Sequence, residues 1–161
     1  MAASPPPPPP AHHSFMAAMR SAGDYAITCR VRSAATSFAT LKSGPMPVYT
    51  YYFTHTPKYS ANYHNLPTLG AFHGSEVPFV FGDAFELVTD PEKTLGKMMG
   101  CYWRNFAHTA DPNGLPCEVK PPTWPAFVPG SDEATMILDV GTIKPAFGLK
   151  VEQCDGFAAA P

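Results

Sequence analysis

The segment VYTYYFTH, Val48 to His55, is the strongest strand signal in the chain and limits what the chain can fold into. It is rich in β-branched and aromatic residues and lies between Pro47 and Pro57. Hydrophobic groups fall on both of its faces, which is typical of a strand covered on both sides in an α/β sheet. Only a short edge strand, Met136 to Asp139, is predicted besides it, and two strands form no stable sheet alone. We therefore expect an α/β fold with an incomplete sheet.

One amphipathic helix is predicted before this strand. Apolar residues recur at helical spacing between Asp24 and Leu41, and Gly44-Pro45 supplies a stop. The positions that share this spacing are Ile27, Val31, Ala34, Ala35, Phe38 and Leu41.

A second helix is predicted after the strand. Thr89 and Glu92 form a potential capping box around Asp90-Pro91, and the turn signal that starts at Asp111-Pro112 should end the helix. Its apolar stripe predicts a core face rather than a cofactor site; the stripe consists of Leu95, Met98, Met99, Tyr102, Trp103 and Phe106.

The first 23 residues differ in composition from the rest of the chain. Six of the 20 prolines are consecutive, Pro5 to Pro10, and they predict an extended polyproline II segment followed by a flexible linker. The segment has neither the pattern of a signal peptide nor that of a membrane span. A ligand for an SH3-like or WW-like module is the alternative to a solvated tail. We thus expect a disordered tail over residues 1–23, a partial domain over 24–157 and a short tail over 158–161.

Charge and cysteine content exclude some classes of function. The net charge of −2 is spread without blocks, so a nucleic-acid partner is not expected. The four cysteines, Cys29, Cys101, Cys117 and Cys154, contain no C-x-x-C pair, which disfavours structural zinc. Their even number permits disulfides, although no export signal accompanies them. We expect no metal and no cofactor.

Reaction chemistry is suggested by GAFHGSEVPFVFG, residues 70–82, which follows a predicted loop. Small neighbours leave the imidazole of His73 free to turn toward a cleft, and an unperturbed histidine exchanges protons near neutral pH. His55, His64 and His73 recur every nine residues, a spacing that matches no familiar metal-ligand pattern. By itself, therefore, His73 is a base without an assigned reactant.

The order of the motifs VYTYYFTH, GAFHGSEVPFVFG, YWRNFAHTADPN, WPAF and MILD resembles the C-terminal end of the type-B carboxylesterases, the family that includes the cholinesterases. The resemblance covers roughly residues 24–157. It implies an α/β-hydrolase fold, a small-molecule ester substrate and a triad base at His73, whereas Glu76 looks structural. It also suggests a Cys29–Cys154 disulfide and a secreted or lumenal location. Two buried thiols in a reducing cytosol are the alternative to this disulfide, and we expect Cys101 and Cys117 to be free. Ala110 replaces the glycine that usually precedes Asp-Pro-Asn.

The rest of the catalytic triad is not found in this sequence. In α/β-hydrolases the triad follows the chain order Ser, Asp or Glu, His, so a C-terminal part retains only the histidine. None of the nine serines has a glycine two positions before it, which excludes a G-x-S-x-G elbow here, and Ser75 is no substitute. We expect an ester hydrolase by descent that is inactive as written. A non-catalytic relative that binds a protein partner through an exposed apolar face, or a fragment of a gene model, is the alternative.

Overall fold

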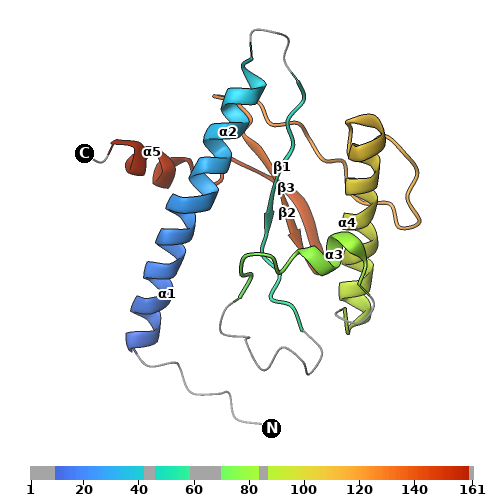
Figure 1. Ribbon diagram of the computed structural model, residues 1–161, viewed down its shortest axis with the longest axis horizontal. Helices are drawn as coiled ribbons and strands as arrows, with labels where there is room; N and C mark the ends of the chain where they lie inside the picture. The colour runs from blue at the N-terminus through green and yellow to red at the C-terminus, as the bar shows by residue number, and fades with distance from the viewer. Residues whose placement is uncertain (1–9, 42–45, 59–69, 84–86, 160–161) are drawn as a thin grey trace. The chain divides into compact units, whose positions relative to one another are not determined.

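The computed structural model describes residues 10–41, 46–58, 70–83 and 87–159, except for the side chains of residues 10–13. The chain divides into two compact units (Figure 1). The first unit combines Met1–Ser37 with Lys150–Pro161, and the second is Phe38–Leu149. The first unit is helical, and the second contains the sheet. None of the described helices is long and apolar enough to cross a membrane.

The first unit is held together by a disulfide and ion pairs. Helix α1 (Pro10–Gly23) leads through a π-helical turn, η1 (Asp24–Thr28), into α2 (Cys29–Ala39), and the chain returns as α5 (Val151–Ala159). Cys29 and Cys154 form the expected disulfide, with Cα atoms 5.2 Å apart. Lys150 Nζ lies 2.9 Å from Asp24 Oδ2. The predicted helix is confirmed over 24–39, and α5 was not predicted.

Helix α1 corrects the prediction that a flexible linker follows the proline run. Residues 10–23 are helical, because alanine, methionine and arginine have high helix propensity and Pro10 suits the first helical position. Residues 1–9, which include most of the proline run, lie outside the described residues. The boundaries of the tails and of the partial domain stay a prediction.

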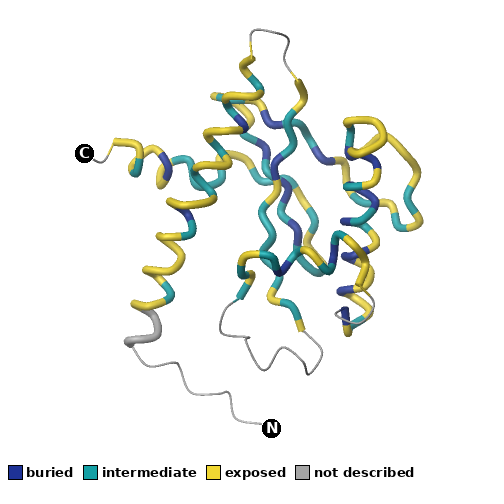
Figure 2. The backbone as a smooth tube through the Cα atoms, viewed as in Figure 1, coloured by how far each residue is buried: buried dark blue, intermediate teal, exposed yellow. Residues whose placement is uncertain are grey.

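The second unit contains a three-stranded sheet of order β1-β2-β3. Strand β1 (Thr50–Phe53) runs parallel to β2 (Ala134–Asp139), and β2 is antiparallel to β3 (Thr142–Phe147). The register pairs Tyr51 with Met136, and Met136 with Pro145. Buried and half-buried positions alternate along β2, as Figure 2 shows.

Strand β2 was predicted as an edge strand, and that prediction is wrong: β2 is the central strand. The error came from β3, in which Pro145 argues against a strand on sequence grounds. Proline lacks the N–H that a ladder needs, so it is tolerated in edge strands, and β3 is the edge. A two-residue turn, Val140-Gly141, joins the strands, and Gly141 has a positive φ of 74°, a conformation that glycine adopts without strain.

Helix α4 (Asp90–Thr109) packs on the sheet and starts where the sequence predicted. Thr89 Oγ1 accepts a hydrogen bond from the backbone N–H of Glu92, and the Glu92 carboxylate accepts one from the backbone N–H of Thr89. The core combines α4 with β2 and the short helix α3 (Val77–Phe81). Its buried members are Phe79, Leu87, Leu95, Met99, Tyr102, Trp124, Met136 and Leu138. The predicted stripe is thus core at its centre, while Phe106 is 48% exposed.

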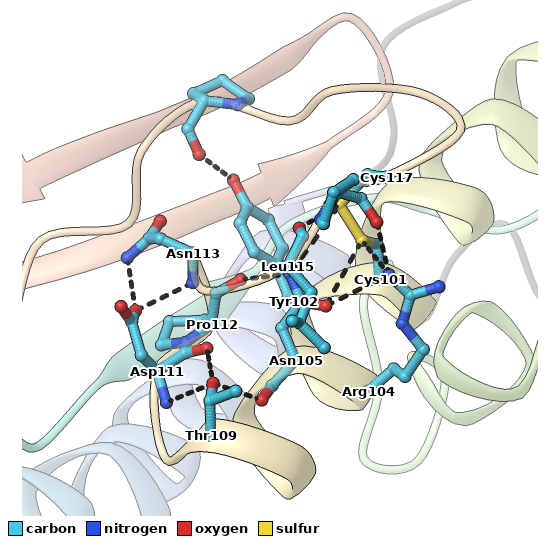
Figure 3. Close-up of a disulfide and its surroundings, with 12 residues drawn as sticks. Cys101, Tyr102, Arg104, Asn105, Thr109, Asp111, Pro112, Asn113, Leu115 and Cys117 are labelled. Atoms are coloured by element: carbon cyan, nitrogen blue, oxygen red, sulfur yellow. Dashed lines mark hydrogen bonds between the residues drawn. A yellow bond between two sulfur atoms is a disulfide. The ribbon is translucent and has the colours of Figure 1, made fainter.

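After α4 the chain folds back along the helix and is fastened to it (Figure 3). Asn105 Nδ2 donates to the carbonyls of Pro112 and Leu115, and Arg104 donates to the carbonyl of Pro116. Cys101 and Cys117 form a disulfide with Cα atoms 5.9 Å apart, so the expectation that both are free is wrong. The turn at residues 111–114 returns the chain toward Cys101, a proximity that spacing alone did not reveal.

Candidate functional site

His73 lies in a turn between β1 and α3. The N–H of Ser75 bonds to the carbonyl of Phe72 at 3.0 Å, and the N–H of Val77 bonds to that of Gly74 at 3.1 Å. Gly74 has a φ of 87°, which favours glycine at this position. The side chain of His73 is exposed, and within the described part of the chain it has no hydrogen-bond partner. An exposed imidazole can accept and return a proton.

The turn is continuous with α3, whose buried side chain is Phe79. The carbonyl of Glu76 accepts hydrogen bonds from the N–H groups of Phe79 and Val80 at 3.0 and 3.1 Å. The Tyr51 hydroxyl of β1 donates to Glu76 Oε1 at 3.4 Å. Burial, and then the charge of Glu76, raise the pKa of Tyr51, so this tyrosine stays a hydrogen-bond donor at neutral pH. The contacts of Glu76 agree with a structural role.

Two glycines of α4 let α3 approach closely. A Cβ atom at Gly100 would lie 3.2 Å from the carbonyl oxygen of Val80, and one at Gly96 would lie 3.4 Å from that of Phe79. Gly96 and Gly100 are four residues apart and therefore share one face of α4. At these two glycines, the backbone of α3, which continues from the His73 turn, lies close to the backbone of α4.

Ser75 is not a nucleophile in this arrangement. Its side chain is 1% exposed, and its hydroxyl has no hydrogen-bond partner among the described residues. A buried hydroxyl two residues from the exposed imidazole of His73 cannot reach a substrate in solution.

A second histidine, His55, is engaged at both ring nitrogens. Nδ1 lies 3.0 Å from Asp139 Oδ1, and Nε2 lies 3.1 Å from Glu92 Oε1. The side chains of His55 and Glu92 are 13% and 2% exposed. Each carboxylate oxygen accepts a hydrogen bond from the ring nitrogen that carries a proton. We call these three residues the His55 cluster.

The carboxylates of the His55 cluster are satisfied by further donors. Glu92 also accepts hydrogen bonds from the N–H of Lys58 at 2.7 Å and from the Thr89 hydroxyl at 2.7 Å. Burial alone would raise the pKa of Glu92, but the hydrogen bonds from Lys58, Thr89 and His55 outweigh it and lower the pKa. Asp139 accepts from Thr54 Oγ1 at 2.9 Å and from the N–H of Val140 at 2.7 Å.

The two histidines have opposite surroundings. His55 has carboxylates but no free ring nitrogen, so it cannot serve as a base. His73 is exposed, but no described carboxylate bonds to its ring. The structure therefore does not assemble a triad from this chain's described residues. Nor do those residues include a group of histidine, cysteine, aspartate or glutamate side chains that could hold a metal ion.

The His55 cluster was missed at the level of sequence. The predicted capping box included Glu92, and the two predicted strands end at His55 and Asp139. These local patterns were the only sequence signals for the three residues of the cluster. Because parallel strands end at the same edge of a sheet, residues at the ends of β1 and β2 come together there. His64 lies outside the described residues.

Comparison with known proteins identifies a family that matches this chain. A family model described as the carboxylesterase family matches residues 9–156. Carboxylesterase 5A of Felis catus is 38% identical over 102 residues, which cover 58% of this chain and 18% of the cat protein. Cocaine esterase of Homo sapiens is 37% identical over 106 residues, 63% of this chain and 17% of the human protein.

Acetylcholinesterase 1 of Caenorhabditis elegans is 40% identical over 96 residues, covering 56% of this chain and 14% of the worm protein. The matched segment is thus less than a fifth of each of these three relatives.

Proposed function

Since the chain belongs to the carboxylesterase family, we propose that it contributes the general base for hydrolysis of carboxylic esters by a serine nucleophile, with His73 as that base. The observation that supports this role best is the exposed imidazole of His73 on a turn anchored by Phe79. Relatives named as esterases match more than half of this chain.

In the proposed reaction His73 acts twice. It accepts the proton of the serine hydroxyl as that oxygen attacks the ester carbonyl, and it returns the proton to the departing alcohol. In the second half it takes a proton from water, which attacks the acyl-enzyme, and returns that proton to the serine. A carboxylate bonded to the other ring nitrogen would keep the imidazole in the productive tautomer.

The serine and the carboxylate are proposed to come from further sequence of a longer polypeptide. The matched part of the three relatives is less than a fifth of their length, and the printed sequence contains no G-x-S-x-G. Loss of the nucleophile costs about as much as loss of a whole triad, on the order of a million-fold in turnover. We therefore expect the 161-residue chain to be inactive by itself.

Inactivity is tested on the chain itself. The purified chain and a His73→Ala variant should hydrolyse p-nitrophenyl acetate at the same rate. Turnover that disappears in the variant would show that this chain contains a nucleophile of its own. Sequencing the transcript upstream of Met1 is the companion experiment, since an in-frame G-x-S-x-G there would supply the missing serine.

The base role is tested in a chimera. Residues 24–157 would replace the corresponding segment of the human cocaine esterase, and ester hydrolysis would be measured with and without His73→Ala. We expect an active chimera whose turnover falls by roughly a thousand-fold or more in the variant. The matched control is His108→Ala, because His108 is an exposed histidine at the end of α4. Equal activity of the chimera and its His73→Ala variant would refute the proposal.

A binding role is the second candidate, and one observation favours it. Within the described sheet, β1 has a neighbour on only one side, so its other edge can accept a strand. The occupant proposed is a β-strand of another esterase segment, which would extend the sheet along β1. A purified chain that is folded, stays monomeric in size-exclusion chromatography and retains no partner in a pull-down would contradict this role.

The two disulfides support a proposal on location. Disulfides persist in oxidising compartments, and Cys29–Cys154 and Cys101–Cys117 are both formed in the structure. We propose a secreted or lumenal location. Free thiols in the protein isolated from its source would argue against it.

A further inference from the structure

His55 faces more than its two carboxylates. Its ring meets the ring of Phe79 edge to face, with centroids 5.6 Å apart and planes at 80°. Phe53 of β1 contacts the same ring at 5.2 Å. Phe79 is fully buried and is the buried residue of α3. Through the ring of His55, the cluster therefore contacts the buried aromatic side chain of α3.

The path from Phe79 to His73 is short and consists of consecutive hydrogen-bonded turns. The N–H of Phe79 bonds to the carbonyl of Glu76, that of Val77 to Gly74, and that of Ser75 to Phe72, all at 3.0 to 3.1 Å. No flexible linker separates the anchor from the turn. A displacement of Phe79 is thus carried into the backbone on both sides of His73.

Hydrogen bonds at both ring nitrogens determine the orientation of the His55 ring. Both ring nitrogens are fixed by carboxylates, and each carboxylate is fixed by other donors at the ends of β1, β2 and α4. A ring clamped at both nitrogens cannot rotate about χ2 without breaking charge-assisted hydrogen bonds. Among the described residues, the cluster thus connects three elements of the second unit to the ring of Phe79.

From these contacts we infer that His55 is a positioning residue: clamped between Glu92 and Asp139, it holds Phe79 and thereby the turn that places His73. The inference rests on the proposed role of His73 as a base. It assigns His55 no contact with substrate or reacting atoms. Small displacements of a catalytic group lower turnover strongly, which gives the cluster a consequence for the reaction.

The first test needs no activity. Amide hydrogen exchange is measured on the whole oxidised chain for Ser75, Val77 and Phe79. His55→Gln should accelerate exchange at these three amides at least tenfold. The variant loses a hydrogen bond to either Glu92 or Asp139, and it loses the ring edge that contacts Phe79. The matched control is Asn113→Ala, which removes the bonds between Asn113 and Trp124 in the returning loop. The control should leave the three amides unchanged.

Equal acceleration in Asn113→Ala, or no acceleration in His55→Gln, would overturn the inference. If His55→Gln does not fold, Asp139→Asn is the milder variant, because it leaves Glu92 and the core unchanged, and it must accelerate the same three amides. Phe79→Leu removes the ring that His55 meets without touching a carboxylate, and it should reproduce the effect.

The second test uses the active chimera. His55→Gln should lower kcat about tenfold with KM changed less than about twofold, because the base is displaced while substrate binding is not. A rise in KM with kcat unchanged would refute the positioning role. The base role of His73 and the positioning role of His55 can fail separately. If His73→Ala leaves the chimera active while hydrogen exchange at the turn still depends on His55, only the base role of His73 is refuted.

Discussion

Replacing Glu92 with glutamine should destabilise the Phe38–Leu149 unit by about 3 kcal/mol. The Glu92 carboxylate is 2% exposed and accepts four hydrogen bonds, two at each oxygen. In glutamine one oxygen becomes an amino group. Whichever way the amide is turned, that group faces the backbone N–H of either Lys58 or Thr89, and two donors cannot bond.

The magnitude follows from these contacts. One buried N–H left without an acceptor costs about 1 to 3 kcal/mol. His55 also loses one of its two charged partners, which converts a charge-assisted hydrogen bond into a neutral one at a cost of about 1 kcal/mol. The sum lies at the lower end of the roughly 3 to 5 kcal/mol expected when one partner of a buried ion pair is removed.

Urea unfolding followed by tryptophan fluorescence is the assay. Both tryptophans of the chain, Trp103 and Trp124, lie in the second unit, so the signal reports on that unit. The matched control is Glu118→Gln, since the Glu118 side chain, in the loop after α4, is 74% exposed and pairs with Lys97 of α4 at 2.6 Å. Exposed ion pairs contribute less than about 1 kcal/mol, so the control should change the free energy of unfolding only slightly.

The pH dependence identifies the cause. Because the pKa of Glu92 is lowered below its ordinary value of 4.5, its charge stabilises the folded chain above pH 4.5 and this stability is lost as the pH falls through the folded pKa. The difference between the wild-type chain and Glu92→Gln should therefore shrink on acidification. A loss below about 1 kcal/mol near neutral pH, or a difference that acidification leaves unchanged, would refute the argument.

Three further changes test other parts of the second unit. Ala110→Gly should raise the free energy of unfolding by about 1 kcal/mol, because Ala110 caps α4 with a φ of 57°, a left-handed conformation that glycine adopts without strain; a lower urea midpoint would contradict this. The double variant Cys101→Ala and Cys117→Ala should lower the free energy of unfolding by about 3 kcal/mol, the loop-closure value for a separation of 16 residues. An unchanged melting temperature would show that the hydrogen bonds of Figure 3 hold the loop without the disulfide. Gly100→Ala should destabilise despite its gain in helix propensity, since the added Cβ lies 3.2 Å from a backbone oxygen of α3; a more stable variant in urea would mean that α3 moves freely.

Local patterns in the sequence were sufficient for several elements of the fold. The Thr89–Glu92 capping box placed the start of α4 correctly, because a cap involves residues only three positions apart. The β-branched and aromatic run at residues 48–55 located β1 in the same way. Family-specific motifs around His73 indicated the carboxylesterase family, and the Cys29–Cys154 disulfide came from that resemblance rather than from spacing.

Tertiary structure decided the features that depend on residues distant in the sequence. β2 became the central strand because β3, with its proline, pairs with it as an edge. Cys101 met Cys117 only because the chain returns along α4.

The His55 cluster shows the physical reason most clearly. His55 and Asp139 are 84 residues apart, and the parallel pairing of β1 and β2 brings them together. Local sequence could single out His73 only as a candidate base. Which histidine is clamped between carboxylates and which is exposed depends on the long-range contacts formed by the folded chain.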